Sequence, residues 1–387
     1  MSVKHAFLRT LIRTLSALAS VVRGPQALPD PDTVRRIVVL QMSGVGDLLL
    51  ITPALRALRH LYPHARIDLL TRRLDNAAGL FRLPNMGSGS EFALFDLELR
   101  HLWTPSFWRT LGGAVRFLRQ EPCDLYVSFH HPWLMQWYLC ELWVAARSGA
   151  RFRVGINPAF VHGAGVFDRA VSESQLGDRH YRFLFLDVVG LLGDSGKDVA
   201  MEFPLRPEEI EEAKTRIHAA LPDCERIVCL HTGASHPAKR WPQDRFAELA
   251  RRLVEEARCG LVFVGSSDEA PLVRYIAAGL PASSYIDAAG RTSIFQLGAL
   301  IEACTMFIGN DSAPLHLAVA RRRPAIGIIG PGDARYYRYH PDEAVIVKDD
   351  PGVSTGNVIM LKETAWAWRI SVEDVFAQAV RLLTAAC

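Results

Sequence analysis

The sequence predicts an α/β protein made of two doubly wound domains, each with a parallel β-sheet covered by helices on both faces. Three observations support this fold class. Short β-branched runs alternate with segments that fit helices, the alternation restarts near residue 226, and a Gly- and Pro-containing stretch at 193–208 separates the two series. Strands that alternate with helices are joined by crossovers, which make neighbouring strands parallel. A chain of 387 residues has room for both domains.

Composition and charge exclude several classes of protein. Apolar residues make up 49% of the chain and charged residues 22%, which is ordinary for a folded domain and argues against extensive disorder. No apolar run approaches the length of a membrane-spanning helix. The seven cysteines are scattered without a CxxC pair, which disfavours a disulfide framework or a zinc site and suits a reducing cytosol. A net charge of +3 is too small to indicate a nucleic-acid partner.

The N-terminal arm, residues 1–30, contains the whole basic excess. Residues 1–29 have four basic and no acidic residues, whereas the rest of the chain has 40 basic and 41 acidic residues. One face of a helix drawn through the arm is apolar, and the opposite face is polar and basic. The apolar face consists of Phe7, Leu8, Leu11, Ile12, Leu15, Leu18 and Val22. The polar and basic face consists of His5, Arg9, Arg13, Ser16, Ser20 and Arg23. Such a helix suits an anionic membrane surface, so we expect a peripheral contact through residues 4–23. The alternative is that the apolar face packs on the protein itself.

The elements follow one another in the order that a doubly wound fold requires. In the first domain (31–192) we expect strands at 37–40, 67–70, 124–128 and 153–156, with a tight turn at 43–47 and a helix to about Leu61 after the first strand. After the linker at 193–208, the second domain (209–360) has strands at 227–230, 261–264, 306–308 and 325–329 and helices at 243–257, 269–279, 293–303 and 314–321. A helical segment, 361–387, ends the chain. Ligands of such sheets bind beyond the carboxyl ends of the strands, and we expect the two domains to face each other across a cleft.

One candidate site is the turn at 309–316, which leaves a strand and opens a helix. The N–H groups of the first helical turn, together with the helix dipole, suit a phosphate. Ser312 adds a hydroxyl there, and His316 follows one turn later. The alternative is that Asp311 or Ser312 only caps the helix.

A second candidate site is the loop at 230–242, which also connects a strand to a helix. It contains small and hydroxyl residues, among them Thr232 and Ser235, and it ends with adjacent cations. Lys239 would supply a point charge to a pyrophosphate and Arg240 a two-pronged donor. Alternatively, Arg240 is a solvated surface charge.

Two further turns carry acidic residues after predicted strands. Asp268 and Glu269 lie in a turn where a carboxylate can hold ribose hydroxyls, or can cap a helix. Gly44-Val45-Gly46-Asp47 lacks the third glycine of a dinucleotide fingerprint, which disfavours a nicotinamide oxidoreductase. Asp47 is either a helix cap or a general base directed at the expected cleft.

Four stretches together resemble glycosyltransferase family 9, the heptosyltransferases of lipopolysaccharide core assembly. They are 46–55, 123–127 with the later 153–155, 239–242 and 310–318. The resemblance implies a GT-B fold with two Rossmann-like domains, an N-terminal one for the acceptor and a C-terminal one for the nucleotide-sugar. It also implies an inverting, metal-independent transfer from ADP-heptose, with no cofactor. Ala313 stands where the family usually has glycine.

The resemblance also implies roles for individual residues. Asp47 is the expected base, Lys239 binds the donor phosphates, and Glu269 or Asp268 holds the donor ribose. The expected donor-binding set is Thr232, Ser235, Lys239, Arg240, Glu269, Asp311, Ser312, Ala313 and His316. The expected acceptor set is Gly46, Arg72 and Arg73. Charge and fold, and not the resemblance, indicate Arg72 and Arg73, together with Arg147, Arg151 and Arg153 of the same domain, as contacts for acceptor phosphates or carboxylates. The alternative is that most of these arginines are surface charges.

The expected acceptor is an anionic glycolipid or core oligosaccharide, and the expected location is the cytoplasm, with the arm at the cytoplasmic face of the inner membrane. Two alternatives stay open. One is a glycosyltransferase with another nucleotide-sugar donor or a polysaccharide acceptor. The other is a non-catalytic nucleotide-binding protein on the same fold.

Overall fold

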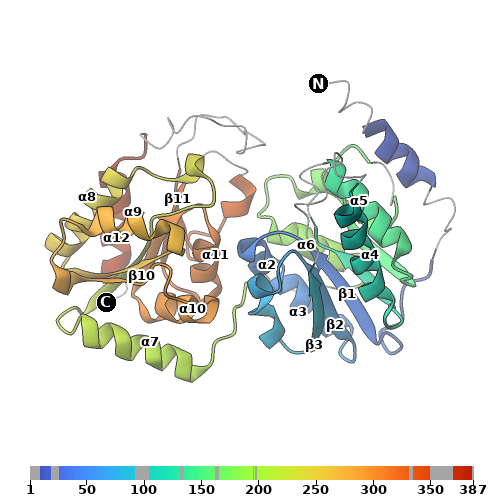
Figure 1. Ribbon diagram of the computed structural model, residues 1–387, viewed down its shortest axis with the longest axis horizontal. Coiled ribbons are helices and arrows are strands. Elements are labelled where there is room, and N and C mark those ends of the chain that lie inside the picture. The colour runs from blue at the N-terminus through green and yellow to red at the C-terminus, as the bar shows by residue number, and fades with distance from the viewer. Residues whose placement is uncertain are drawn as a thin grey trace. The chain divides into compact units, whose positions relative to one another are not determined.

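The computed structural model describes residues 9–18, 26–91, 104–130, 135–161, 165–194, 196, 198–330, 334–348 and 369–385. The contacts within the chain divide it into two compact units, Met1–Met201 and Glu202–Cys387. Each unit contains one six-stranded sheet in which all neighbouring strands are parallel (Figure 1). The predicted α/β fold class is confirmed.

The sheet of the first unit has the strand order β3-β2-β1-β4-β5-β6. Its strands are β1 (Arg36–Gln41), β2 (Arg66–Thr71), β3 (Met86–Glu91), β4 (Leu125–Ser128), β5 (Phe152–Asn157) and β6 (Arg169–Ser172). Helices α4 (Pro105–Arg119) and α5 (Met135–Arg147) pack on one face, and α2 (Val45–Leu50), α3 (Thr52–Leu61) and α6 (Arg182–Gly190) cover the other (Figure 1). Short 3₁₀ helices occur at η1 (Asp75–Ala77), η2 (Leu80–Arg82) and η5 (Glu173–Leu176). Because both faces are covered, every residue of β1 is buried.

The sheet of the second unit has the order β12-β11-β10-β7-β8-β9, which is the same winding. Its strands are β7 (Arg226–His231), β8 (Cys259–Val264), β9 (Tyr285–Asp287), β10 (Met306–Asn310), β11 (Ala325–Ile329) and β12 (Val345–Lys348). Helices α8 (Gln243–Glu255), α9 (Ala270–Ala277) and α12 (Val372–Ala385) share a core on one face, and α7 (Pro207–Ala220), α10 (Ile294–Ala303) and α11 (Ala313–Ala320) lie on the other (Figure 1). The 3₁₀ helices are η6 (Pro237–Lys239), η7 (Ser267–Glu269), η8 (Ala282–Ser284) and η9 (Ala334–Tyr337).

The edge strands are the part of the sheets that the sequence did not predict. All eight interior strands were expected, whereas β3, β6, β9 and β12, the two edges of each sheet, were not. An interior strand is buried on both faces and reads as a continuous apolar run. The edge strand β3, with the sequence MGSGSE, has no such run. Strand β3 therefore carries a weak local signal, whereas the edge strand β12, with the sequence VIVK, was missed although it contains an apolar run.

The helix expected to run from the first turn to Leu61 is in fact two helices. Helix α2 ends at Leu50 and α3 begins at Thr52, with Ile51 between them. Pro53 has no N–H to donate to the preceding turn, so it ends one helix and starts another. The Thr52 hydroxyl donates instead to the carbonyl of Leu49 at 2.7 Å.

Residues 9–18 of the arm are helical, and the rest of the predicted arm helix lies outside the described residues. Ile12 and Ser16 are 0% and 2% exposed and face the first unit, whereas Leu15 and Leu18 are 42% and 59% exposed. The Arg9 guanidinium lies 5.2 Å from the ring centre of Phe160. The expectation that Ser16 lies on the exposed polar face is wrong, since the buried stripe runs along one border of the apolar face. Within the described ranges, no helix is both long and apolar enough to cross a membrane.

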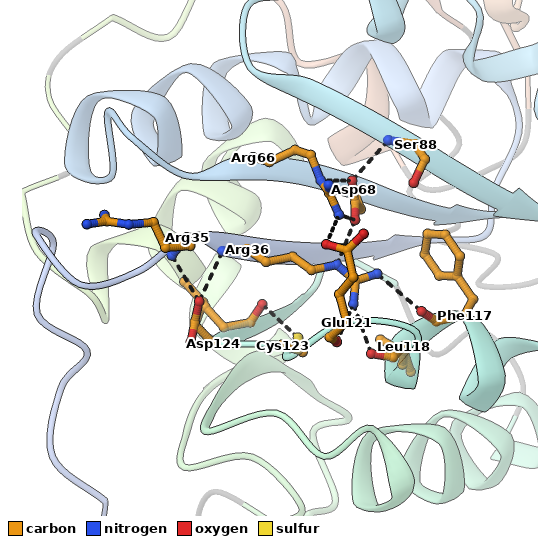
Figure 2. A network of polar contacts seen from close by, with 11 residues as sticks. Arg35, Arg36, Arg66, Asp68, Ser88, Phe117, Leu118, Glu121, Cys123 and Asp124 are labelled. Carbon is orange, nitrogen blue, oxygen red and sulfur yellow. Dashed lines mark hydrogen bonds and ion pairs between the residues drawn. The ribbon is translucent and has the colours of Figure 1, made fainter.

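A buried ion network lies at the amino edge of the first sheet (Figure 2). Asp68 of β2 is 0% exposed and accepts from Arg36 of β1 at 2.7 Å, from Arg66 at 3.0 Å and from the Ser88 N–H of β3 at 2.9 Å. Arg36 also donates to carbonyls at the end of α4, including that of Phe117 at 3.1 Å. One carboxylate thereby links three strands, and its partner arginine links them to a helix end, where a cation is favourable.

Candidate functional site

The carboxyl ends of β7 and β10 lie side by side at the centre of the second sheet, where the strand order reverses. Such a reversal point is where doubly wound sheets bind ligands. Asn310, the last residue of β10, is fully buried and connects the loops that leave both strands. Its amide nitrogen donates to the carbonyls of Thr232 at 2.9 Å and Gly233 at 3.1 Å, and its amide oxygen accepts from the Trp241 N–H at 3.0 Å. Asn310 was not predicted as a site residue, and it fixes the backbone of the predicted donor loop.

Lys239 and Asp311, both predicted donor-site residues, form an ion pair at this sheet edge. The Lys239 ammonium lies 2.9 Å from Asp311 Oδ2, and their side chains are 25% and 3% exposed. Burial raises the pKa of Asp311, and the charge and hydrogen bond of Lys239 oppose that rise. The buried carboxylate thus orients a partly exposed ammonium.

His316 lies on α11, one turn beyond the helix start, and is packed among tyrosines that the sequence did not indicate. Its ring stacks on Tyr337 with the centres 5.4 Å apart, and its Nδ1 contacts the Tyr339 hydroxyl. Burial, assisted by the charge of Lys239, lowers the pKa of His316 to about 3. His316 is therefore neutral at physiological pH and serves this site as a packed, uncharged side chain.

Ser312, His231 and Glu269 form a chain of polar contacts across three strand ends. His231 Nδ1 lies 2.9 Å from Ser312 Oγ, and His231 Nε2 lies 3.4 Å from Glu269 Oε2. Ser312 occupies the N-cap position of α11, but its side chain makes no capping hydrogen bond and donates to the Asn310 carbonyl at 3.0 Å. Glu269 accepts from the Ser266 N–H at 2.8 Å, so it caps a turn and also reaches His231. His231 was not selected from the sequence, although it directly precedes the predicted Thr232.

The other predicted donor residues lie in different environments. Thr232 is buried, and its hydroxyl has no hydrogen-bond partner within the described residues. Ser235 is exposed at the loop tip, and Ala313 is the first residue of α11. Arg240 donates twice to the carbonyl of Ala234, at 3.1 and 3.0 Å, so part of its guanidinium closes the loop. Asp268, the alternative to Glu269, is exposed and has none of the contacts that Glu269 makes to His231.

In the first unit, the predicted acceptor residues follow the adjacent strands β1 and β2. Asp47 is half-buried in the first turn of α2, next to the buried Gly46. Arg72 and Arg73 follow Thr71, which pairs with Gln41 at the end of β1. Helix α2 contacts η1, which lies just beyond these arginines. Burial and the neighbouring Arg73 lower the pKa of Arg72, as expected for two cations held at one sheet edge.

Arg147, Arg151 and Arg153 do not belong to that edge. Arg147 ends α5, and Arg151 and Arg153 lie at the start of β5, the amino end of a parallel strand. Arg151 pairs with Asp124 at 3.4 Å, and Arg153 is buried. The interpretation of these three cations as acceptor contacts is therefore wrong, because the sheet separates them from the carboxyl ends of β1 and β2.

A buried carboxyl group of α5 contacts the last residue of β4. Glu141 of α5 is fully buried and accepts a hydrogen bond from the Ser128 hydroxyl. Burial raises the pKa of Glu141 from 4.5 to about 8, although the Ser128 hydrogen bond acts in the opposite direction. Its second oxygen has no hydrogen-bond partner within the described residues. This carboxyl group is therefore mostly protonated at neutral pH.

Comparison with known proteins identifies the family of this chain. The model of "Glycosyltransferase family 9 (heptosyltransferase)" matches residues 143–354. Lipopolysaccharide heptosyltransferase 2 of Salmonella typhimurium is 30% identical over 359 residues, which are 89% of this chain and 96% of that protein. Lipopolysaccharide heptosyltransferase 3 of Escherichia coli K12 is 25% identical over 303 residues, 76% of this chain and 82% of that protein.

Solved structures support the same fold. The family 9 glycosyltransferase of Veillonella parvula superposes with a TM-score of 0.72 at 20% identity, covering 93% of this chain and 99% of that one. The E. coli ADP-heptose lps heptosyltransferase II gives a TM-score of 0.65 at 20% identity, covering 90% and 98%. The two sheets accordingly have the GT-B architecture. The chain is a glycosyltransferase that belongs to glycosyltransferase family 9, the heptosyltransferase family.

Proposed function

We propose that this enzyme transfers heptose from ADP-heptose to an anionic lipopolysaccharide core acceptor, with inversion and without a metal ion. In this reaction an acceptor hydroxyl oxygen forms a bond to the anomeric carbon of the sugar. The bond from that carbon to the diphosphate oxygen breaks, ADP leaves with the bonding electrons, and the hydroxyl proton passes to Asp47. Attack from the face opposite the leaving group inverts the anomeric centre. The first unit supplies the base and the acceptor contacts, and the second unit binds the donor.

The observation that carries the proposal is the Lys239–Asp311 pair at the joined ends of β7 and β10. A partly exposed ammonium oriented by a buried carboxylate, beside the start of α11, suits a diphosphate that gains charge as it leaves. The similar proteins are heptosyltransferases of lipopolysaccharide and lipooligosaccharide, which supports heptose as the sugar.

Metal independence is supported by the same ammonium, which supplies a fixed positive charge. Within the described ranges, no group of three or more His, Cys, Asp or Glu side chains is placed to hold a metal ion. We expect turnover to be unchanged after dialysis against EDTA. A loss of turnover that Mg²⁺ or Mn²⁺ restores would contradict this part of the proposal.

A screen of nucleotide-sugars tests the donor. A ligand that binds only the folded protein raises its melting temperature. We expect ADP-heptose and ADP to raise it and UDP- and GDP-sugars to have no effect, and we expect Lys239→Ala to lose the response. A response to UDP- or GDP-sugars alone would indicate a different donor. Binding of ADP-heptose without transfer to any core acceptor would indicate a nucleotide-binding protein without glycosyltransferase activity.

The arm supports a peripheral membrane contact as a second part of the proposal. Leu15 and Leu18 are exposed on the helix at 9–18, and Arg9 and Arg13 lie on the same short segment. Apolar side chains beside cations suit an anionic lipid surface. We expect Leu15→Asp with Leu18→Asp to reduce co-sedimentation with phosphatidylglycerol vesicles. Ile12 and Ser16 hold the helix on the first unit, so this variant leaves that packing in place, and unchanged co-sedimentation would contradict the contact.

A further inference from the structure

His231 joins the three loops that form the proposed donor site. It ends β7, and its imidazole contacts Ser312, which follows β10, and Glu269, which follows β8. We infer that His231 is a positioning residue for the donor, which holds the oxygen of the Ser312 hydroxyl so that its proton is available to a diphosphate oxygen. This inference depends on the proposed function and adds to it a residue that need not touch the donor.

The hydrogen bonds around Ser312 indicate that His231 donates to the Ser312 oxygen. Its hydroxyl has a single proton, which it donates to the Asn310 carbonyl at 3.0 Å. His231 Nδ1, at 2.9 Å, is then the donor to Ser312 Oγ. On the other side of the ring, His231 Nε2 lies 3.4 Å from Glu269 Oε2. The imidazole thus lies between Ser312 and Glu269, with its Nδ1–H directed at the serine oxygen.

Two glycines leave room for the Glu269 side chain to reach His231. A Cβ atom at Gly233 would lie 1.7 Å from Glu269 Oε1, and one at Gly265 would lie 2.7 Å from Oε2. Any larger residue at Gly233 would displace the carboxylate. Burial alone would raise the pKa of Glu269, but the hydrogen bond and charge of His231, together with Ser266, lower it to about 2. The carboxylate therefore stays ionised beside His231 across the physiological range.

The arrangement allows Ser312 to donate a hydrogen bond to a leaving diphosphate. When a phosphate oxygen replaces the Asn310 carbonyl as the acceptor, the Ser312 proton turns toward it while His231 keeps the Ser312 oxygen in place. A hydroxyl whose oxygen already accepts a hydrogen bond is a stronger donor itself, because successive hydrogen bonds polarise one another. His231 would act on the donor through Ser312.

Two substitutions separate the contacts of the imidazole. The amide of His231→Asn can occupy the position of Nδ1 and reach Ser312, whereas the longer side chain of His231→Gln can occupy the position of Nε2 and reach Glu269. We expect the Kd of the full-length protein for ADP, measured by calorimetry, to rise on the order of tenfold in His231→Gln and to stay within about threefold of wild type in His231→Asn.

A double-mutant cycle with Ser312→Ala tests whether both residues act through one hydrogen bond. We expect Ser312→Ala to weaken ADP binding about as much as His231→Gln, and the double variant to be no weaker than either single variant. His218→Gln, on the exposed surface of α7, is the matched control and should leave the Kd unchanged. The melting temperature without ligand, measured for every variant, reports any loss of folding.

The possible outcomes separate the two proposals. Wild-type protein that binds no adenine nucleotide would overturn the proposed function and this inference with it. Wild-type protein that binds ADP, together with a His231→Gln variant that binds it equally well, would overturn this inference alone. Additive losses in the cycle, or a tenfold loss in His231→Asn, would also overturn it, because His231 would then act independently of Ser312. If His231→Gln does not fold, Ser312→Ala decides, because an unchanged Kd for ADP in that variant would overturn the inference.

Discussion

Asp47 is the acidic residue in the first turn of α2, directly beyond the central strand β1. It is half-buried, which leaves a carboxylate that an acceptor hydroxyl can approach. The N-cap of this helix is Gly44, whose carbonyl accepts from the Leu48 N–H at 3.1 Å. The expectation of a general base is consistent with this position.

We predict that Asp47→Asn lowers kcat by 10²- to 10⁴-fold, the range usual for loss of a general base. The Kd for ADP should stay within about twofold of wild type, because the donor loops belong to the second unit. Steady-state kinetics with calorimetry for ADP measures both quantities. Asp32→Asn, an exposed acid before β1, is the control. Near-normal turnover of Asp47→Asn would refute the assignment of the base.

Glu141 couples stability to pH. Its pKa rises from 4.5 in the unfolded chain to about 8 in the fold through burial. Between these values the folded protein keeps a proton that the unfolded chain releases, so the free energy of unfolding falls as pH rises through this window. The effect is about 1.4 kcal/mol per pKa unit.

We predict that Glu141→Gln removes this slope. Relative to wild type, the variant should gain melting temperature steadily from pH 5 to pH 8.5, because its amide does not ionise. Thermal melts at half-unit pH intervals measure the difference. A difference between variant and wild type that is constant across the range would mean that the carboxyl group stays ionised or solvated.

At the scale of elements, the Asp68 network shows how polar groups hold an apolar sheet together. Asp68 links β1, β2 and β3, and the same arginine partner fixes the end of α4 (Figure 2). Gly87 permits this packing, since a Cβ atom there would lie 2.2 Å from Asp68 Oδ1. A buried charge in such a network must keep its partner, because an unpaired buried charge is costly.

We predict that Asp68→Asn lowers the free energy of unfolding by about 3–5 kcal/mol, because it leaves Arg36 buried without a carboxylate. Glu121→Gln removes the exposed partner of Arg66 and should cost less than about 1 kcal/mol. Urea denaturation at pH 7 compares the two. Equal losses would show that burial does not distinguish these ion pairs.

At the scale of the whole molecule, two sheets of identical strand order carry different side chains at the carboxyl ends of their central strands. The first unit has Asp47 with Arg72 and Arg73 beyond β1 and β2, and the second has the Lys239–Asp311 pair and the His231 chain beyond β7 and β10. Under the proposed function, one winding thus supports two chemistries, a base with cations in one unit and an anion site in the other. The basic excess of the chain lies outside both, in residues 1–29.

We predict that ADP protects only the second unit from hydrogen exchange. Amides at 231–235 and 309–316 should exchange at least tenfold more slowly at saturating ADP, since a bound ligand suppresses local opening. Amides of β1 should be unaffected. Protection confined to peptides around 43–50 would instead place the nucleotide in the first unit.

Local pattern was sufficient for the eight interior strands and for the turns that follow β1, β7, β8 and β10. Each of these features is encoded within a few neighbouring residues, as an apolar run followed by glycine or a polar turn. Pro53 also carried a local signal for the break after α2, although its effect was not anticipated.

What only the tertiary structure decided are the contacts between distant residues. Arg36 and Asp68 are 32 positions apart, and His231 and Ser312 are 81 apart. For a histidine at the end of an apolar strand, or an aspartate within one, no local pattern indicates which residue will be its partner. The sequence alone was therefore sufficient to predict the fold class, the family and the loops of the proposed site. The pairing of strand ends in space decided which side chains meet there, because hydrogen bonds and ion pairs depend on distances of about 3 Å that only packing sets.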